Sequence, residues 1–375
     1  MNGDHNMLQK FFLNCSVLLT LAAILCGCQS FPAEPPRFER VFCWGNPQNE
    51  EMARKYSEIG VTDIRINNKK EYDLAIKYGM TPYCGVFLPA GPYKQVMTKE
   101  ETEYCNYING KDLDRKKLGS KKFQQILNQR RMEKNHRFGG ETDHGEMSTL
   151  GGYHIACFNS DKDYKMSKKR LDSIIDKSVP GVKGIYLDYL GYNNHNGCYC
   201  KVCLEDYRAY LKAKNLPDTI ENKNIFYRDI LVKYYNELID YIKSKRPDFK
   251  VLVHIYPYFQ PDPLFANRTK ADYCGQTVAW YFSWPLDKVK HYTKVTVERA
   301  KDYYPNAEGI PFVGLNARKD QALAHKTPEQ LEKELQTILA AGGRTLQVCN
   351  GSDMIKPGYY EVFRKYCTKA ANVKE

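Results

Sequence analysis

The sequence predicts an α/β fold, a (β/α)8 barrel of parallel strands, with a long insertion after the third strand. Short apolar segments recur along the chain, and most are followed by a segment with the 3.6-residue spacing of an amphipathic helix. This alternation is typical of parallel strands joined by crossover helices. Eight principal strands can be counted, and 375 residues with 42% hydrophobic side chains are enough for one such barrel.

The segment before the insertion is expected to supply the first three strands. In the second of them Thr62, Ile64 and Ile66 fall on one face, which is the period-two pattern of a strand. Asp63 and Arg65 fall on the other face. The expected elements are a strand at 41–44, a helix at 49–59, a strand at 61–66, a helix at 70–78 and a strand at 81–88.

The insertion, at about residues 99–152, is rich in basic side chains. Between Lys111 and Arg137 it carries ten Lys or Arg residues against Asp112, Asp114 and Glu133. Loops that follow barrel strands gather over the C-terminal face of the barrel, so we expect the insertion to lie there. A basic lid over the mouth would attract an anionic substrate, whereas the alternative is a solvated loop with no part in binding.

The other five strands follow the insertion, after a strand-like piece at 153–158. The expected elements are a helix at 167–179, a strand at 184–190, helices at 204–214 and 225–244, strands at 251–256 and 277–282, a helix at 286–303, a strand at 310–315, a helix at 328–341 and a strand at 344–348. An open, doubly wound sheet is the alternative, but no glycine-rich dinucleotide fingerprint follows the first strand. We therefore expect one barrel domain at 39–375.

The first 27 residues have the features of a secretory signal. Lys10 precedes a short apolar stretch, Phe11–Leu25, which is too short to span a membrane comfortably. The sequence Leu25-Cys26-Gly27-Cys28 resembles the lipobox of bacterial lipoproteins, which implies that Cys28 is lipidated and becomes the mature N-terminus. Residues 28–38 would then form a tether, and the protein would be anchored in the cell envelope, with the outer membrane as the expected location. An ordinary cleaved signal is the alternative.

The chain carries a formal charge of +12. A basic protein can bind nucleic acid, but export away from the cytoplasm argues against that partner. Acidic extracellular glycans are the expected partners of an exported basic barrel. The alternative is that the charge serves solubility alone.

Residues at the C-terminal ends of the strands are the candidates for substrate binding, because barrel enzymes carry their chemistry there. The sequence places aromatic, amide and basic side chains at these ends. Such a mixture suits a sugar, since rings stack on it and polar groups bind its hydroxyls. The candidate substrate-binding residues are Trp44, Arg65, Tyr192, His254, Tyr256, Trp284 and Asn316. A structural role is the alternative for each of them.

A C-x-C-x-x-C knot at Cys198, Cys200 and Cys203 lies about eight residues after the expected fourth strand. Three thiolates at this spacing suit zinc, which binds four ligands at a Zn–S distance of about 2.3 Å. Cys157 lies just before the helix that leads into the fourth strand, so it could come beside the knot as the fourth ligand. Two disulfides are the alternative, because export permits them.

Both cysteine segments resemble glycoside hydrolase family 42 and related clan A barrels. The resemblance rests on Cys157-Phe158-Asn159-Ser160 and on Cys198-Tyr199-Cys200-Lys201-Val202-Cys203, and it covers residues 150–215. In that family a cysteine upstream of the fourth strand joins a knot after the strand to hold zinc. The resemblance implies a structural zinc site and a barrel that hydrolyses glycosidic bonds.

The catalytic glutamates of that family are missing here. The fourth strand ends Leu187-Asp188-Tyr189-Leu190, and the seventh reads Val313-Gly314-Leu315-Asn316-Ala317, with no glutamate in either. Asp188 is therefore the candidate nucleophile, because an aspartate that ends an apolar strand at the mouth suits that role. The candidates for the second carboxylate are Asp262 and Asp353, with Glu141 and Asp143 as further alternatives.

Two functions follow from these residues. The first is a glycoside hydrolase that acts on an oligosaccharide or polysaccharide, for which an acidic glycan is one candidate. The second is a non-catalytic lipoprotein that binds glycans on a degenerate barrel.

Overall fold

A computed structural model of the chain describes residues 36–88, 95–108, 110–132, 156–192, 196–255, 264–281, 284–318 and 325–367. The chain divides into two units, Met1–Pro36 and Arg37–Glu375, and the second holds all the described strands and helices. The expected signal at 1–27, the lipidated Cys28 and most of the tether lie outside the described residues.

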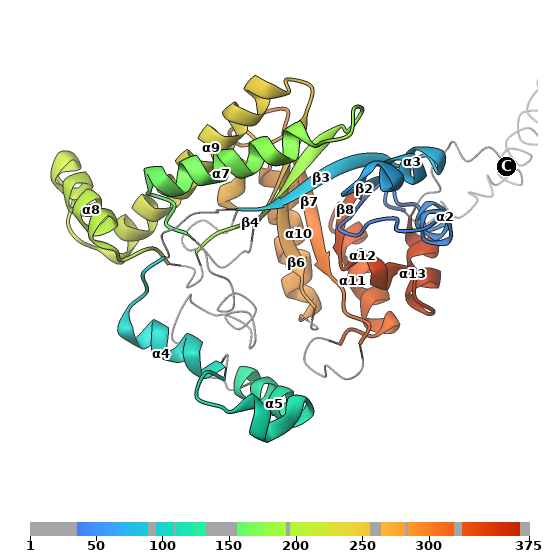
Figure 1. Cartoon of the computed structure of the whole chain (residues 1–375), viewed down its shortest axis with the longest axis horizontal. Coiled ribbons are helices and arrows are strands. Elements are labelled where there is room, and N and C mark those ends of the chain that lie inside the picture. The colour runs from blue at the N-terminus through green and yellow to red at the C-terminus, as the bar shows by residue number, and fades with distance from the viewer. Residues whose placement is uncertain are drawn as a thin grey trace, which may run out of the picture. The chain divides into compact units, whose positions relative to one another are not determined.

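Eight parallel strands pair in chain order and close into a barrel, which confirms the predicted fold class (Figure 1). The strands are β1 (Arg40–Cys43), β2 (Asp63–Arg65), β3 (Thr81–Phe87), β4 (Gly184–Leu190), β5 (Lys250–Ile255), β6 (Tyr273–Ala279), β7 (Glu308–Gly314) and β8 (Thr345–Cys349). β8 pairs with β1, with Phe42 opposite Gln347, and this pairing closes the ring.

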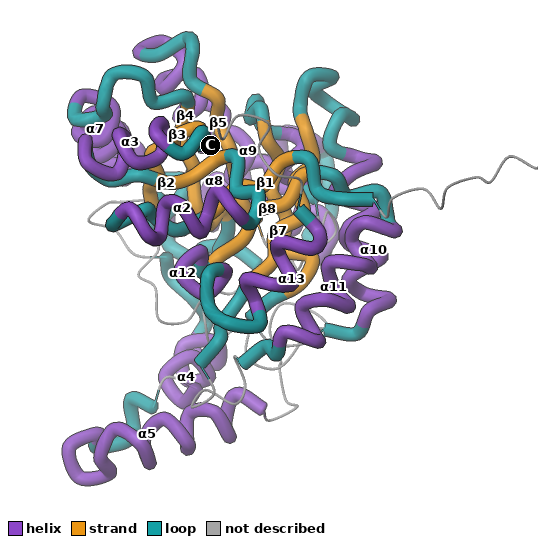
Figure 2. Tube along the Cα trace, turned by 90° about the vertical axis from the view of Figure 1, so that its right-hand side faces the viewer, coloured by secondary structure: helices purple, strands orange, loops and turns teal. Residues whose placement is uncertain are grey.

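Helices surround the strands (Figure 2). They are α2 (Glu50–Glu58), α3 (Lys69–Lys77), α4 (Lys99–Ile108), α5 (Arg115–Met132), α7 (Asp161–Asp176), α8 (Lys201–Lys214), α9 (Ile220–Lys245), α10 (Leu286–Arg299), α11 (Pro328–Ala340), α12 (Gly351–Met354) and α13 (Tyr359–Tyr366), with a 3₁₀ turn η1 (Phe265–Arg268). Many begin at a polar cap; Asn49, for example, accepts a hydrogen bond from the backbone N–H of Met52. In the described part of the chain, no helix is both long and apolar enough to cross a membrane.

The predicted elements differ from the observed ones at two strand positions. β6 begins at Tyr273, four residues before the predicted start, because all seven of its residues are buried and its Gly275 and Gln276 hide the strand pattern. The strand-like piece at 153–158 is not a strand over 156–158, the part of it that the structure describes. α7 also begins earlier than predicted, at a cap formed by Ser160.

The insertion between β3 and β4 is confirmed, and its described part is helical. α4 and α5 contact each other and project to one side of the barrel strands in both views (Figures 1 and 2). α5 carries seven Lys or Arg residues and no acidic residue. The remainder of the insertion, residues 133–152, lies outside the described residues.

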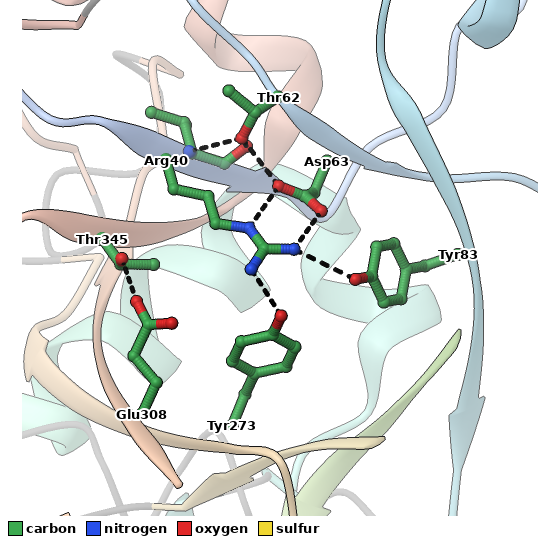
Figure 3. A network of polar contacts seen from close by, with 8 residues as sticks. Arg40, Thr62, Asp63, Tyr83, Tyr273, Glu308 and Thr345 are labelled. Atoms are coloured by element: carbon green, nitrogen blue, oxygen red, sulfur yellow. Dashed lines mark hydrogen bonds and ion pairs between the residues drawn. The ribbon is translucent and has the colours of Figure 1, made fainter. Parts of the chain in front are cut away.

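An ion pair lies at the N-terminal end of the barrel (Figure 3). The Arg40 guanidinium donates to both oxygens of Asp63, at 2.8 and 2.7 Å, and also to the hydroxyls of Tyr83 and Tyr273. Thr62 donates a further hydrogen bond to the Asp63 carboxylate. We call this group of side chains the floor of the barrel; it comprises Arg40, Thr62, Asp63, Tyr83 and Tyr273. Each of them has a hydrogen-bond partner, which is what burial of a charge requires.

Aromatic rings fill the barrel above this floor. Tyr83 and Tyr186 stack with centroids 5.2 Å apart, and Phe42 meets both rings edge-on. Leu252 and Ile310 complete this layer. The filled interior leaves the opposite, C-terminal end of the barrel as the place for a binding site.

We predict that Asp63→Asn lowers the free energy of unfolding by about 2 kcal/mol, because it leaves the Arg40 charge without its carboxylate. Urea unfolding of the purified protein, followed by circular dichroism, measures the change. Arg54→Gln is the matched control, since it breaks the exposed Arg54–Glu58 pair on α2 and should leave the midpoint unchanged. Equal shifts in the two variants would contradict a special role for the floor pair.

Candidate active site and metal centre

A carboxylate and an imidazole meet at the mouth of the barrel. Asp188 on β4 and His254 on β5 lie with Oδ1 and Nδ1 3.1 Å apart, and Nε2 of His254 lies 2.9 Å from Oγ1 of Thr277 on β6. The Asp188 side chain is 17% exposed and the His254 side chain 2%. Three neighbouring strands therefore fix one carboxylate at the edge of the solvent.

The partners of His254 assign its proton. An ionised carboxylate can only accept hydrogen bonds, so Nδ1–H of His254 donates to an ionised Asp188, and in the neutral ring Nε2 then accepts from the Thr277 hydroxyl. The ring also stacks on Phe312, with centroids 3.8 Å apart and planes at 19°. Held by two hydrogen bonds and one ring, His254 fixes the orientation of the Asp188 carboxylate.

A second charged group, the Arg65 guanidinium, comes from β2, across β3 from Asp188. The guanidinium carbon of Arg65 lies 5.0 Å from the ring centroid of Trp44, a cation–π contact. Trp44 in turn packs against Tyr186, with centroids 5.2 Å apart. Gly85 leaves the space that both side chains need, since a Cβ there would lie 2.8 Å from Arg65 and from the Trp44 ring.

Cys349, at the end of β8, shares the mouth with these groups. Burial raises the pKa of its thiol to about 12, and the charge of Asp188 acts in the same direction. A hydrogen bond with Tyr281, at 3.2 Å, and the charge of Arg65 oppose this shift in pKa. Cys349 is thus a neutral thiol at neutral pH, and the charges of Asp188 and Arg65 both act on it.

Two residues that the sequence predicted for the mouth form hydrogen bonds or ion pairs with the loops after β7 and β8. Asp353 is buried; its Oδ2 accepts from the backbone N–H of Ala317 at 3.0 Å, and its Oδ1 lies 2.5 Å from Nζ of Lys356. Asn316 is buried too, and its side-chain oxygen accepts from the backbone N–H of Arg318. Both side chains thus connect or order the loops after β7 and β8.

Two aromatic residues that the sequence predicted to bind sugar are buried against other side chains. Tyr192 is buried between Phe158 and Tyr227, and Trp284 is buried with the Lys288 ammonium 3.9 Å from its ring centroid. Their sugar-binding role stays a prediction. The predicted residues outside the described part of the chain are Tyr256 and Asp262, together with the alternatives Glu141 and Asp143.

The sequence did not reveal Thr277 or Gly85 as residues of the site. Thr277 meets His254 only because β5 and β6 pair with His254 opposite Gly275, and no local pattern encodes that register. Gly85 interrupts an expected strand, and a glycine there is a known signal of close approach by a neighbouring group. That signal could have drawn attention to the position.

The four predicted cysteines form one cluster, and their potential ligand atoms all lie within 4.8 Å of one another. Cys157 Sγ lies 3.5 Å from that of Cys203 and 3.9 Å from that of Cys200. No disulfide joins them; all nine cysteines whose side chains are described are free thiols. Sulfurs at the corners of a tetrahedron around zinc would lie about 3.8 Å apart, so the cluster fits a metal ion of that size.

Neighbouring groups hold the cluster in place. Asp163 accepts from the backbone N–H of Cys157 at 2.9 Å, and the Tyr227 hydroxyl donates to the backbone oxygen of Cys198 at 2.6 Å. Hydrogen bonds from Cys157 and Cys203 and from the backbone N–H of Val96 lower the pKa of the Cys198 thiol. The cluster therefore favours at least one thiolate, the form that binds metal.

The chain that follows β3 is fastened to this cluster. The backbone N–H of Val96 donates to Cys198 Sγ at 3.4 Å, and that of Tyr199 donates to the Val96 oxygen at 2.9 Å. Gln95 adds a hydrogen bond from its amide to the Gly197 oxygen at 2.9 Å. We call residues 95–98 the strap, because they join the start of the insertion to the cysteine loop.

Comparison with solved structures places this barrel among known folds. The glycoside hydrolase domain of PgaB (BpsB) from Bordetella bronchiseptica matches with a TM-score of 0.51 and 11% identity, over 89% of this chain and 100% of that one. The barrel resembles those of glycoside hydrolases. An identity this low shows similarity of fold alone.

Two β-galactosidases match less closely. The enzyme from Bacillus circulans sp. alkalophilus has a TM-score of 0.46 and 13% identity, over 84% of this chain and 51% of its own. The GH42 enzyme from G. stearothermophilus has a TM-score of 0.45 and 12% identity, over 83% and 51%. This chain thus spans about half the length of these β-galactosidases. No protein-family profile and no curated protein matches the sequence.

We predict that the purified protein holds about one metal ion per chain and that Cys157→Ser loses most of it, because three thiolates bind zinc-like ions less tightly than four. Inductively coupled plasma mass spectrometry measures the metal. Cys84→Ser is the matched control, since Cys84 is a buried thiol of β3 outside the cluster. Metal-free wild-type protein, or an equal loss in both variants, would contradict the site.

Proposed function

We propose that this protein hydrolyses glycosidic bonds of an oligosaccharide or polysaccharide at the C-terminal mouth of its barrel, with Asp188 as the catalytic carboxylate. One observation carries the proposal. Oδ1 of Asp188 is held by His254, whereas Oδ2 has no hydrogen-bond partner among the described residues, and the side chain is partly exposed. One oxygen is thus fixed and the other is available to a substrate.

The chemistry that suits this carboxylate is attack on an anomeric carbon. Oδ2 would form the bond to that carbon while a second carboxylic acid protonates the departing glycosidic oxygen, and water would then release the sugar. Retaining enzymes place the two carboxyl groups about 5–5.5 Å apart, and inverting enzymes about 6.5–9.5 Å. Both oxygens of Asp353 already bind other groups, so we assign the acid to Asp262 or to the insertion residues Glu141 and Asp143.

The cysteine cluster suits a structural zinc ion in this proposal. Four thiolates leave no open position for water, so the ion would brace the loop after β4 and take no part in the reaction. Cys157, Cys198, Cys200 and Cys203 are its proposed ligands, and their separations support the assignment. The brace would hold β4, and with it Asp188, in position.

The proposed site of action is the cell envelope. The lipobox-like sequence that ends at Cys28 supports a lipid anchor, and the outer membrane is the proposed location. An anchored barrel would meet glycans that arrive from outside the cell.

A glycan-binding protein without activity is the second candidate. The engagement of Asp353 with Ala317 and Lys356 favours it, because one of the two sequence-predicted partners of Asp188 is already committed elsewhere. This candidate needs the same mouth and the same sugar contacts, but no catalytic acid.

We predict that Asp188→Asn reduces hydrolysis at least about 1,000-fold and leaves glycan affinity within a few-fold of wild type, because the amide keeps the shape of the side chain but cannot act as nucleophile. Reducing-sugar release and isothermal titration calorimetry on a panel of glycans measure the two effects. Asp176→Asn on α7 is the matched control.

The outcomes separate the two candidates. Loss of hydrolysis in Asp188→Asn with binding intact supports the enzyme. A wild-type protein that binds glycans of the panel and cleaves none of them supports the binding protein instead.

A further inference from the structure

We propose that Arg65, held over Trp44 in the mouth, recognises an anionic group on the glycan, either a carboxylate or a sulfate. This inference rests on the proposed function only in taking the mouth as the glycan site. It adds the substrate class, an acidic glycan, and the residue that selects it.

The first observation is that no described carboxylate pairs with Arg65, in contrast to two other cations of the barrel domain. Arg40, at the floor, pairs with Asp63, and the fully buried Lys326 pairs with Glu334 at 2.6 Å. Among the described residues, Arg65 contacts Trp44 and has a buried Nε with no hydrogen-bond partner. The side chain is partly exposed but its Nε is buried, and a buried donor without a partner is costly, so a ligand anion that accepts from it would bind favourably.

The second observation is that neither neighbouring carboxylate is available to Arg65. Asp63 is two residues earlier on β2, and both of its oxygens accept from Arg40. Asp188 is directed to His254, and no ion pair joins it to Arg65 among the contacts of the described residues. Among the described residues the charge of Arg65 therefore has no anion, and we take a group of the ligand to be its partner.

The third observation is that the fold makes room for this cation. Gly85, on the strand between Arg65 and Asp188, carries no side chain, and a Cβ would come within 2.8 Å of both Arg65 and Trp44. The Trp44 ring supports one face of the guanidinium. A supported guanidinium has its donors pre-arranged as a planar fork, which matches the two oxygens of a carboxylate or sulfate.

The position of Arg65 relative to Asp188 suits an anion on a sugar that is linked to the one being cleaved. β2 and β4 flank β3, and Arg65 lies opposite Tyr83 whereas Asp188 lies opposite Phe87. Their backbones are therefore two strand spacings apart sideways, about 10 Å, and four residues apart along the strands, about 13 Å. The Arg65 side chain shortens this separation, because its Cδ lies beside Gly85, farther along β3. A single sugar ring is too short to reach both residues. Linked sugars can place an anion at Arg65 and an anomeric carbon near Asp188.

The test measures binding to matched acidic and neutral glycans. Uronate oligosaccharides are compared with their carboxyl-reduced forms, and sulfated oligosaccharides with their desulfated forms, by calorimetry on the Asp188→Asn protein so that turnover does not interfere. We expect at least one acidic glycan to bind roughly 10- to 100-fold more tightly than its neutral form. Arg65→Gln should abolish that preference and leave the affinity for the neutral form unchanged.

Two further variants keep the test decisive. Arg364→Gln removes the same charge from the exposed face of α13 and should retain the preference. Gly85→Ala should weaken acidic-glycan binding without touching either charge, because it displaces Arg65 and Trp44. Unfolding midpoints and metal content identify a variant that fails to fold.

Several outcomes would overturn the inference. They are the absence of any acidic preference across the panel, an equal loss for acidic and neutral glycans in Arg65→Gln, and an equal effect of Arg364→Gln. Cleavage of neutral glycans alone would reject the inference and leave the hydrolase standing. An acidic preference that depends on Arg65, in a wild-type protein that cleaves nothing, would support the inference and reject the hydrolase.

Discussion

Closure of the barrel in a single register is the constraint on which the site depends. Once Phe42 lies opposite Gln347 and His254 opposite Gly275, alternate residues of every strand must face the interior together. The Arg40–Asp63 pair and the aromatic layer fill one end of that interior. At the C-terminal end, the inward-facing polar side chains of the strands are therefore directed into the mouth.

The mouth combines a carboxylate held in one orientation, Asp188, with a guanidinium, Arg65, that no described carboxylate pairs with. Asp188 is oriented by a histidine that is itself held by Thr277 and by the Phe312 ring, so the carboxylate costs little to organise when a substrate arrives. Arg65 is supported by the Trp44 ring and has no anionic partner in the part of the chain that the structure describes. In the proposed site, these preorganised groups of opposite sign, on either side of Gly85, would make the mouth selective for charge as well as for shape.

Local sequence patterns predicted the barrel, the insertion and the cysteine cluster, because alternation and close cysteine spacing are visible along the chain. Side-chain contacts between neighbouring strands could not be predicted from the sequence. Asp188 and His254 were each predicted as residues of the mouth, but their hydrogen bond depends on lateral register. The binding of Asp353 to the Ala317 backbone depends on loop geometry, which composition does not encode. The early start of β6 was missed because a fully buried strand loses the alternation that reveals it.

The free thiols of the described residues decide which reagents can destabilise this fold. With nine unpaired cysteines and no covalent cross-link in the described residues, a reducing agent has no bond to break there. With a metal ion in the cysteine cluster, as we propose, the barrel would instead be sensitive to chelators, because capture of the metal would release the strap and the loop after β4 together. A fold braced in this way would depend on the local supply of metal and not on an oxidising compartment.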